Sequence, residues 1–263
     1  MAASACQRFA STALAVAWGT LVCASAGATE PGKRWCAPEL AALSEHTCFF
    51  EPEPQREPTS HRVLVIFFHG LLGDGSSWQW EQQRLMARTA AAYGFSALMP
   101  RGRLGIGPGR DPAVRAWPNS AWAQLTVESE VLAELSQTRR AVELQRGSFE
   151  QVLVFGFSNG AYYAASLALR GKLAVDGYGV FAGGSGNRYD GLLAAKAERR
   201  VPIFVGYGTR DPDHVRQKQL LALLRRQDWP HRGKAANVGH TVTDGQIRAA
   251  LSFFTNGPAR AED

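Results

Sequence analysis

The chain of 263 residues is poor in cysteine and paired histidines, which are typical of metal-binding proteins, and it lacks the excess of charge that is typical of disordered proteins. It contains only four cysteines and no paired histidines, so the ligand spacing of a structural zinc site is absent. Charged residues make up 20% of the chain and apolar residues 45%, which are ordinary values for a globular protein. We therefore predict a folded protein with neither a metal site nor a cofactor.

Positive charge is in modest excess, at +6 for the whole chain. The excess is scattered over pairs such as Arg139-Arg140, Arg199-Arg200 and Arg225-Arg226, which fall in separate predicted helices. A nucleic-acid-binding protein gathers such charge into one basic patch with interleaved aromatic residues. The sequence therefore predicts no nucleic-acid partner.

No apolar run reaches the roughly 20 residues that cross a bilayer. The nearest approach is residues 9–28, which follow Arg8, carry no charge and end in small residues. This layout is typical of a secretory signal peptide over residues 1–28, with cleavage after Ala26 or Ala28. An uncleaved membrane anchor is the alternative, but serine, threonine and glycine interrupt the apolar core. We expect a secreted or periplasmic protein without stable membrane insertion after cleavage.

Only Cys36 and Cys48 remain once the leader is removed. In an exported protein, two cysteines 12 positions apart most simply form one disulfide, and free thiols or metal ligands are the alternatives. Residues 29–62 are therefore predicted to be an N-terminal segment with a disulfide, ahead of one domain over residues 63–263.

Short apolar runs alternate with helical patterns through that domain, which predicts an α/β fold with a mainly parallel sheet and helices on both faces. The predicted strands are Val63–Phe68, Phe95–Met99, Gln151–Phe157, Val175–Phe181, Val201–Tyr207 and, weakly, Lys234–Val238. The predicted helices are Trp78–Tyr93, Ser120–Arg146, Asn159–Arg170, Leu192–Arg200, Asp213–Gln227 and Asp244–Phe254. Residues 101–119 are rich in glycine and proline and are interpreted as a long loop that lines a binding cleft.

One pentapeptide contains a candidate nucleophilic serine. Gly156-Phe157-Ser158-Asn159-Gly160 matches G-x-S-x-G and lies directly between a strongly apolar strand and a helix of small residues. A turn from strand to helix in one step strains the serine backbone and exposes its Oγ above the sheet. The backbone N–H of Asn159, at the start of the helix, points toward the same space and is a candidate oxyanion donor.

At this motif the chain resembles the α/β-hydrolase superfamily, and the resemblance extends from Val63 to Phe254. His69-Gly70-Leu71-Leu72-Gly73-Asp74 follows the first predicted strand. In that superfamily an H-G turn supplies the second oxyanion donor, which the resemblance assigns to Leu71, with Leu72 as the alternative. The resemblance implies no separate lid domain, since only 19 residues (182–200) separate two consecutive strands.

A serine hydroxyl becomes a nucleophile only when an imidazole takes its proton and a carboxylate orients the imidazole. The superfamily order is serine, acid, histidine. Asp211 follows a strand in a G-x-x-D turn and is the predicted acid, with Asp213 as its main competitor. His240 follows the weak strand, precedes the last helix and is the predicted base.

Together with the export predicted from residues 1–28, the resemblance implies a serine esterase that cleaves small or medium acyl esters, or thioesters, as small carboxylesterases and lysophospholipase-thioesterases do. Secreted feruloyl esterases and polyester depolymerases are the alternative relatives, and a hydrolase fold that only binds ligands is an alternative of another class. The predicted partner is a small-molecule ester, and the oligomeric state is not predicted. The candidate cleft wall consists of Leu71, Leu72, Trp78, Trp117 and Tyr162.

Overall fold

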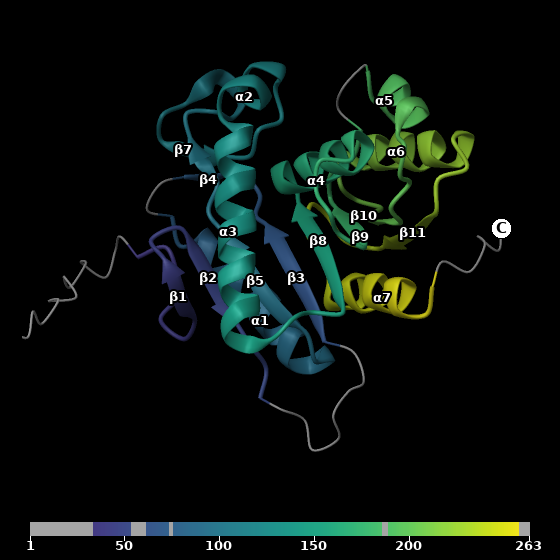
Figure 1. Cartoon of the computed structure of the whole chain (residues 1–263). Coiled ribbons are helices and arrows are strands. Elements are labelled where there is room, and N and C mark those ends of the chain that lie inside the picture. Colours follow the sequence, from purple (N-terminus) through teal and green to yellow (C-terminus); the bar gives the residue numbers. More distant parts are fainter. Residues whose placement is uncertain (1–33, 54–61, 74–75, 186–188, 258–263) are drawn as a thin grey trace, which may run out of the picture.

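A computed structural model describes residues 34–53, 62–73, 76–185 and 189–257. An eight-stranded sheet forms the centre of the molecule (Figure 1), in the order β1-β2-β5-β3-β8-β9-β10-β11. The strands are β1 (Ala41–Ser44), β2 (Thr47–Phe50), β3 (Val63–Phe68), β5 (Ser96–Pro100), β8 (Gln151–Phe157), β9 (Gly177–Phe181), β10 (Ile203–Gly208) and β11 (His231–Ala236). The five pairings from β5 to β11 are parallel, whereas β1 with β2 and β2 with β5 are antiparallel.

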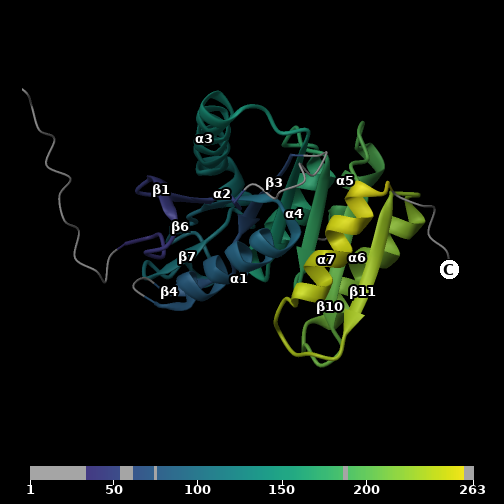
Figure 2. The same cartoon turned by 90° about the horizontal axis from the view of Figure 1, so that it is seen from below.

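Helices cover both faces of this sheet (Figure 2). They are α1 (Trp78–Tyr93), α2 (Ala121–Thr126), α3 (Glu128–Arg146), α4 (Asn159–Arg170), α5 (Asp190–Lys196), α6 (His214–Arg226) and α7 (Asp244–Thr255). The helices α1 and α7 lie on one face, and α3, α4 and α6 lie on the other. The predicted α/β fold, with a mainly parallel sheet and helices on both faces, is therefore confirmed. No helix among the described residues is both long enough and apolar enough to cross a membrane.

Two hydrophobic cores result, one on each side of the sheet. Along β3, Leu64, Ile66 and Phe68 enter the core beneath α3, α4 and α6, while the intervening residues enter the core beneath α1 and α7. Alternate residues of a strand point to opposite faces, so a strand covered on both sides must be apolar throughout. This constraint explains the unbroken run Val63–Phe68, all of which is buried.

The predicted helix Ser120–Arg146 is wrong in one respect, because two helices replace it. Val127 has non-helical angles (φ −127°, ψ −27°) and separates α2 from α3. The β-branched pair Thr126-Val127 has weak helix propensity. Val127 also packs against the core beneath α3, which compensates for the break.

The loop prediction for residues 101–119 also needs correction. This segment has its own structure, since β6 (Arg103–Leu104) and β7 (Val114–Ala116) join β4 (Leu72–Gly73) in a three-stranded antiparallel sheet. The glycines Gly105 and Gly109 both adopt φ of +69°, which makes the tight turns between these strands feasible. The segment is thus fastened to the turn after β3.

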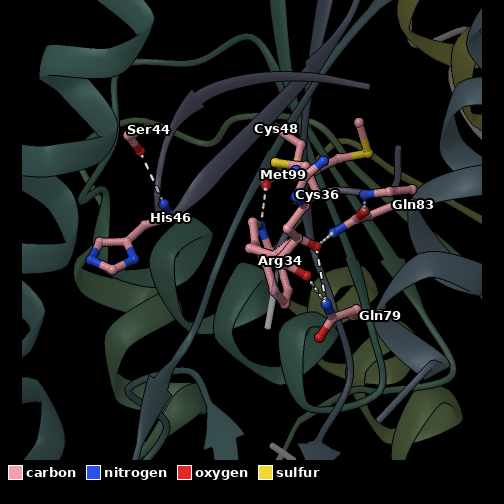
Figure 3. The surroundings of a disulfide bond; sticks show 10 residues. Arg34, Cys36, Ser44, His46, Cys48, Gln79, Gln83 and Met99 are labelled. Atoms are coloured by element: carbon pink, nitrogen blue, oxygen red, sulfur yellow. Dashed lines mark hydrogen bonds between the residues drawn. A yellow bond between two sulfur atoms is a disulfide. The ribbon is translucent and has the colours of Figure 1, made fainter. Parts of the chain in front are cut away.

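The N-terminal segment joins the main sheet and is fixed by a disulfide between Cys36 and Cys48 (Figure 3), the pair named from the sequence. Next to the disulfide, Trp35 donates its indole N–H to the carbonyl of Met99. The amide side chain of Gln83 donates to the carbonyl of Trp35 and accepts from the N–H of Ala37. The segment is therefore attached to both β5 and α1.

We expect removal of the disulfide to destabilise the fold. Closing a loop with a sequence separation of 12 residues stabilises a protein by about 3 kcal/mol, which corresponds to a fall in Tm of roughly 6–12 °C for a domain of this size. Scanning calorimetry of a Cys36→Ala/Cys48→Ala double variant tests this. The parent under reductant should show the same fall, and the double variant should be insensitive to reductant. A Tm within about 2 °C of the oxidised parent would contradict the prediction.

Candidate active site

Ser158 lies at the turn between β8 and α4, at the carboxyl edge of the sheet. Its backbone adopts φ 52° and ψ −116°, a conformation that non-glycine residues rarely adopt. Its N–H donates to the carbonyl of Phe181 on β9, a distance of 2.9 Å. The strain predicted for this serine is therefore present, and the neighbouring strand holds it in place.

The two glycines of the motif are required by close backbone approach. A Cβ at Gly156 would lie 2.3 Å from the carbonyl oxygen of Gly160, and a Cβ at Gly160 would lie 2.2 Å from the carbonyl oxygen of Phe68. Such separations are far below van der Waals contact. A side chain at either position would push α4 away from β3 and β8 and displace Ser158.

A chain of hydrogen bonds connects Ser158 to two residues from the C-terminal third of the sequence. His240 Nε2 lies 2.8 Å from Ser158 Oγ, and His240 Nδ1 lies 3.0 Å from Asp211 Oδ2. The three residues follow β8, β10 and β11, which are parallel strands whose carboxyl ends share one edge of the sheet. The ring of Phe157 lies 5.3 Å from that of His240 and supports it from one side.

Asp211 rather than Asp213 accepts the bond from His240. The carboxylate of Asp211 is only 1% exposed, and its second oxygen accepts the backbone N–H of Asp213 at 2.9 Å. The carbonyl of Asp211 also contacts Nδ1 of His214. Asp211 is therefore fully engaged in one orientation, while the side chain of Asp213 remains exposed.

The candidate oxyanion donors are the backbone N–H groups of Leu71 and Asn159. Within the described residues, neither N–H donates a hydrogen bond to the protein. Other atoms of these two turns are well anchored: the N–H of Gly70 donates to Gln82, and the side chain of Asn159 accepts the N–H of Trp117. The turns are thus held rigidly while the two N–H groups remain available.

His69 is a structural residue at the same edge. Its Nε2 accepts the N–H of Gly102 at 2.8 Å, so its proton resides on Nδ1, which donates to the carbonyl of Gly70. The imidazole is buried between the rings of Trp35 and Trp117. Burial, the largest cause, lowers the pKa of His69 to about 4, so the ring is neutral at pH 7. It joins the turn after β3 to the segment 101–119.

A cavity of about 740 Å³ opens beside Ser158. Its wall includes Leu71 and Tyr162, two of the five residues expected there. The prediction that Trp117 and Leu72 line the cleft is wrong, because their exposed fractions are 1% and 2% and both belong to the hydrophobic cores. The same prediction is wrong for Trp78, which is 58% exposed at the start of α1 and does not line the cavity. The sequence does not show which of these apolar residues line the cavity, since their burial depends on the tertiary packing of the turns that carry them.

Several wall residues were not predicted. Asn119, Tyr189, Asp190 and Asp213 lie at or just before the starts of α2, α5 and α6, and Ser166 lies within α4. Asp213 was considered only as a competitor for the acid. The position of Ser166 two turns after Ser158 on α4 was the one signal that could have placed it near the site.

A family model for the dienelactone hydrolase family matches residues 51–255 of this chain. The chain belongs to the dienelactone hydrolase family. The protein is accordingly a hydrolase that cleaves ester bonds, on the α/β-hydrolase fold that the sequence indicated.

Solved structures agree with this family membership at the level of the fold. Serine hydrolase FphF of Staphylococcus aureus, described as fluorophosphonate-binding, is 15% identical with a TM-score of 0.57, over 80% of this chain and 92% of its own. Esterase PE8 is 16% identical with a TM-score of 0.57, over 79% and 96% of the two chains. A variant of SOBER1 from Arabidopsis thaliana is 19% identical with a TM-score of 0.57, over 74% and 98%. No curated protein sequence matches the chain.

Only one group of acidic and histidine side chains in the described part of this family member is close enough to hold a metal ion. It comprises Asp211, Asp213 and His240, whose ligand atoms lie within 4.8 Å of one another. Two of them already form the hydrogen-bonded chain with Ser158. A metal ion ligated by a ring nitrogen of His240 would therefore displace a bond within that chain.

We expect His69 to make this hydrolase sensitive to acid. An unfolded histidine has a pKa of about 6.5, so the unfolded chain binds a proton between pH 6.5 and 4 while the folded chain does not. The full stability is therefore present above pH 6.5 and falls by about 2–3 kcal/mol by pH 4.5. Urea midpoints of the parent and of His69→Gln at pH 7, 5.5 and 4.5 test this.

The His69→Gln variant should be less stable at pH 7 but should lose less stability on acidification. His231→Gln, which removes a half-buried histidine elsewhere, is the matched control and should follow the parent. Parallel acid curves for the parent and His69→Gln would contradict the prediction.

Proposed function

We propose that this hydrolase cleaves carboxylic esters with Ser158 as nucleophile, His240 as general base and Asp211 as the carboxylate that orients the histidine. The single observation that carries the proposal is the unbroken chain Ser158 Oγ to His240 Nε2 (2.8 Å) and His240 Nδ1 to Asp211 Oδ2 (3.0 Å). A serine at a strained strand-to-helix turn, bonded to such a pair, is the arrangement that nucleophilic catalysis requires.

In the first half of the reaction, Ser158 Oγ attacks the ester carbonyl while its proton passes to His240 Nε2. The resulting imidazolium is stabilised by the buried carboxylate of Asp211, which accepts the Nδ1–H bond throughout. His240 then donates the proton to the leaving alcohol, and an acyl group remains on Ser158. Water then gives a proton to His240 while its oxygen attacks the acyl carbon. The bond between that carbon and Ser158 Oγ breaks, the acid leaves, and His240 returns the proton to Oγ, which restores the serine.

The negative charge that develops on the carbonyl oxygen needs donors already in place. In this proposal, the backbone N–H groups of Leu71 and Asn159 provide them, supported by their lack of other partners within the described residues. Asn159 is the first residue of α4, so the positive end of the helix dipole reinforces its N–H. A carbonyl oxygen bound there stays aligned with Ser158 Oγ.

The cavity size favours small or medium acyl esters, thioesters included. A volume of about 740 Å³ fits ligands of ordinary metabolite size. Between β9 and β10 the described chain carries only the seven-residue helix α5, which is too short to form a lid domain. Exposed Leu71 and the ring of Tyr162 contribute to the apolar part of the wall.

Export is part of the proposal. The leader pattern of residues 1–28 lies outside the described residues, and the support from the structure is the disulfide between Cys36 and Cys48. Disulfides persist in oxidising compartments, which include the periplasm and the extracellular space. Both locations suit an enzyme that acts on small esters.

Substitution of the three residues should abolish turnover. We expect Ser158→Ala to lose both labelling by a fluorophosphonate probe and hydrolysis of p-nitrophenyl butyrate, with kcat lower by about 10⁴-fold or more. His240→Ala and Asp211→Asn should lower kcat by about 10³–10⁴-fold, and a triple variant should be no worse than Ser158→Ala alone. Asp176→Asn, a carboxylate at the opposite edge of the sheet, is the control. A Ser158→Ala enzyme as active as the parent would refute the mechanism.

Cleavage of the leader can be tested on the exported protein. Expression of the full chain in a bacterium with a Sec pathway should yield a mature protein whose first residue is Gly27 or Thr29 by intact mass. A chain recovered from the membrane fraction with the leader still attached would instead support the anchor alternative.

A further inference from the structure

Asp213 presents a carboxylate to the cavity beside Ser158. It is the N-terminal flanking residue of α6, a position where aspartate normally caps the helix, yet its side chain makes no capping bond. Its backbone is held instead, because its N–H donates to Asp211 and its carbonyl accepts the N–H of Arg216. The exposed carboxylate lines the cavity, and one of its oxygens lies within 4.8 Å of a ring nitrogen of His240.

No positive side chain balances this charge in the described wall of the cavity. Its described lining includes two aspartates, Asp213 and Asp190, and neither lysine nor arginine. Asp190 is buried, and its carboxylate accepts the hydroxyl of Ser185.

Two arginines of segment 101–119 contact other groups. Arg103 pairs with Glu130 and Glu134, and the guanidinium of Arg110 lies over the ring of Trp122. Neither of them lines the cavity. A substrate anion would therefore find no arginine from residues 103 or 110 to neutralise it.

The wall residue Tyr162 responds to the same charge distribution. Burial is the main cause of its raised pKa, and the nearby charge of Asp213 is the second cause, also raising it. Arg216 acts in the opposite direction but more weakly, and Asp211 adds to the effect of Asp213. The charges that act on the Tyr162 hydroxyl are therefore negative on balance.

We propose that Asp213 determines substrate charge: it makes the cavity favour neutral or cationic esters over esters that carry a carboxylate near the scissile bond. This inference rests on the proposed function of Ser158. Two negative charges at a partly desolvated site repel each other, and water at the cavity mouth weakens this repulsion. A discrimination of roughly tenfold or more in kcat/KM follows.

The experiment compares three p-nitrophenyl esters of similar length: butyrate, hemisuccinate as the anion and 4-aminobutyrate as the cation. The parent should have the lowest kcat/KM for the hemisuccinate. In Asp213→Asn the ratio of hemisuccinate to butyrate should rise about tenfold, and the ratio of 4-aminobutyrate to butyrate should fall. Asp213→Glu, which retains the charge, should keep the parent's order of preference. High salt should reduce the discrimination in the parent.

Asp228→Asn is the matched control, because it removes the same charge just beyond the opposite end of α6. Its ratios should equal those of the parent. Ratios unchanged in Asp213→Asn, or changed equally in Asp228→Asn, would overturn the role of Asp213 while leaving the mechanism intact. Failure of all three esters to show turnover that depends on Ser158 would overturn the proposed function and this inference with it.

Discussion

The close approach of three backbones at the end of β8 is the constraint on which the site depends. The chain must pass from β8 into α4 in one step, which puts φ of Ser158 at 52° and leaves no space for a side chain at Gly156 or Gly160. Packing offsets this backbone strain, since β8 is buried between β3 and β9 and α4 is apolar along most of its length. The result is a rigid serine whose hydroxyl projects beyond the sheet, within reach of whatever follows β10 and β11.

A second layer of support comes from the N-terminal half of the chain. The disulfide fixes Trp35, whose ring lies against His69, and His69 joins the turn after β3 to the segment 101–119. Trp117 completes this layer by donating its indole N–H to the carbonyl of His69. These aromatic and imidazole groups are buried and do not face the cavity. They therefore act on Leu71 and Asn159 only by holding the turns that carry these two residues in place. A neutral His69 suits this role, because a charged imidazole at the same place would lose the bond from Gly102 and its solvation together.

The neighbourhood of His240 shows how two aspartates two positions apart differ in environment. Asp211 is buried and bonded through both oxygens, whereas Asp213 is exposed at the start of a helix that it does not cap. A short turn after β10 produces both environments. One carboxylate is thereby held against the histidine, and the other adds charge to the cavity wall.

Much of this was accessible from the sequence. The run Val63–Phe68 and the turn Gly156–Gly160 are determined locally, because a doubly covered strand must be apolar and a strand-to-helix turn of this kind requires glycine on both sides of the serine. The superfamily order of serine, acid and histidine, together with the positions of Asp211 and His240 after β10 and β11, identified the other two residues of the chain of hydrogen bonds. Tertiary structure alone decided which apolar residues face the cavity. Trp117 and Leu72 are buried, since segment 101–119 pairs with the chain after β3, and the exposed Trp78 does not line the cavity. Tertiary structure also decided the break at Val127, because long-range packing overrides local preference. It decided the exposure of Asp213 as well, because the spacing of residues in a sequence does not predict whether a side chain makes a capping bond.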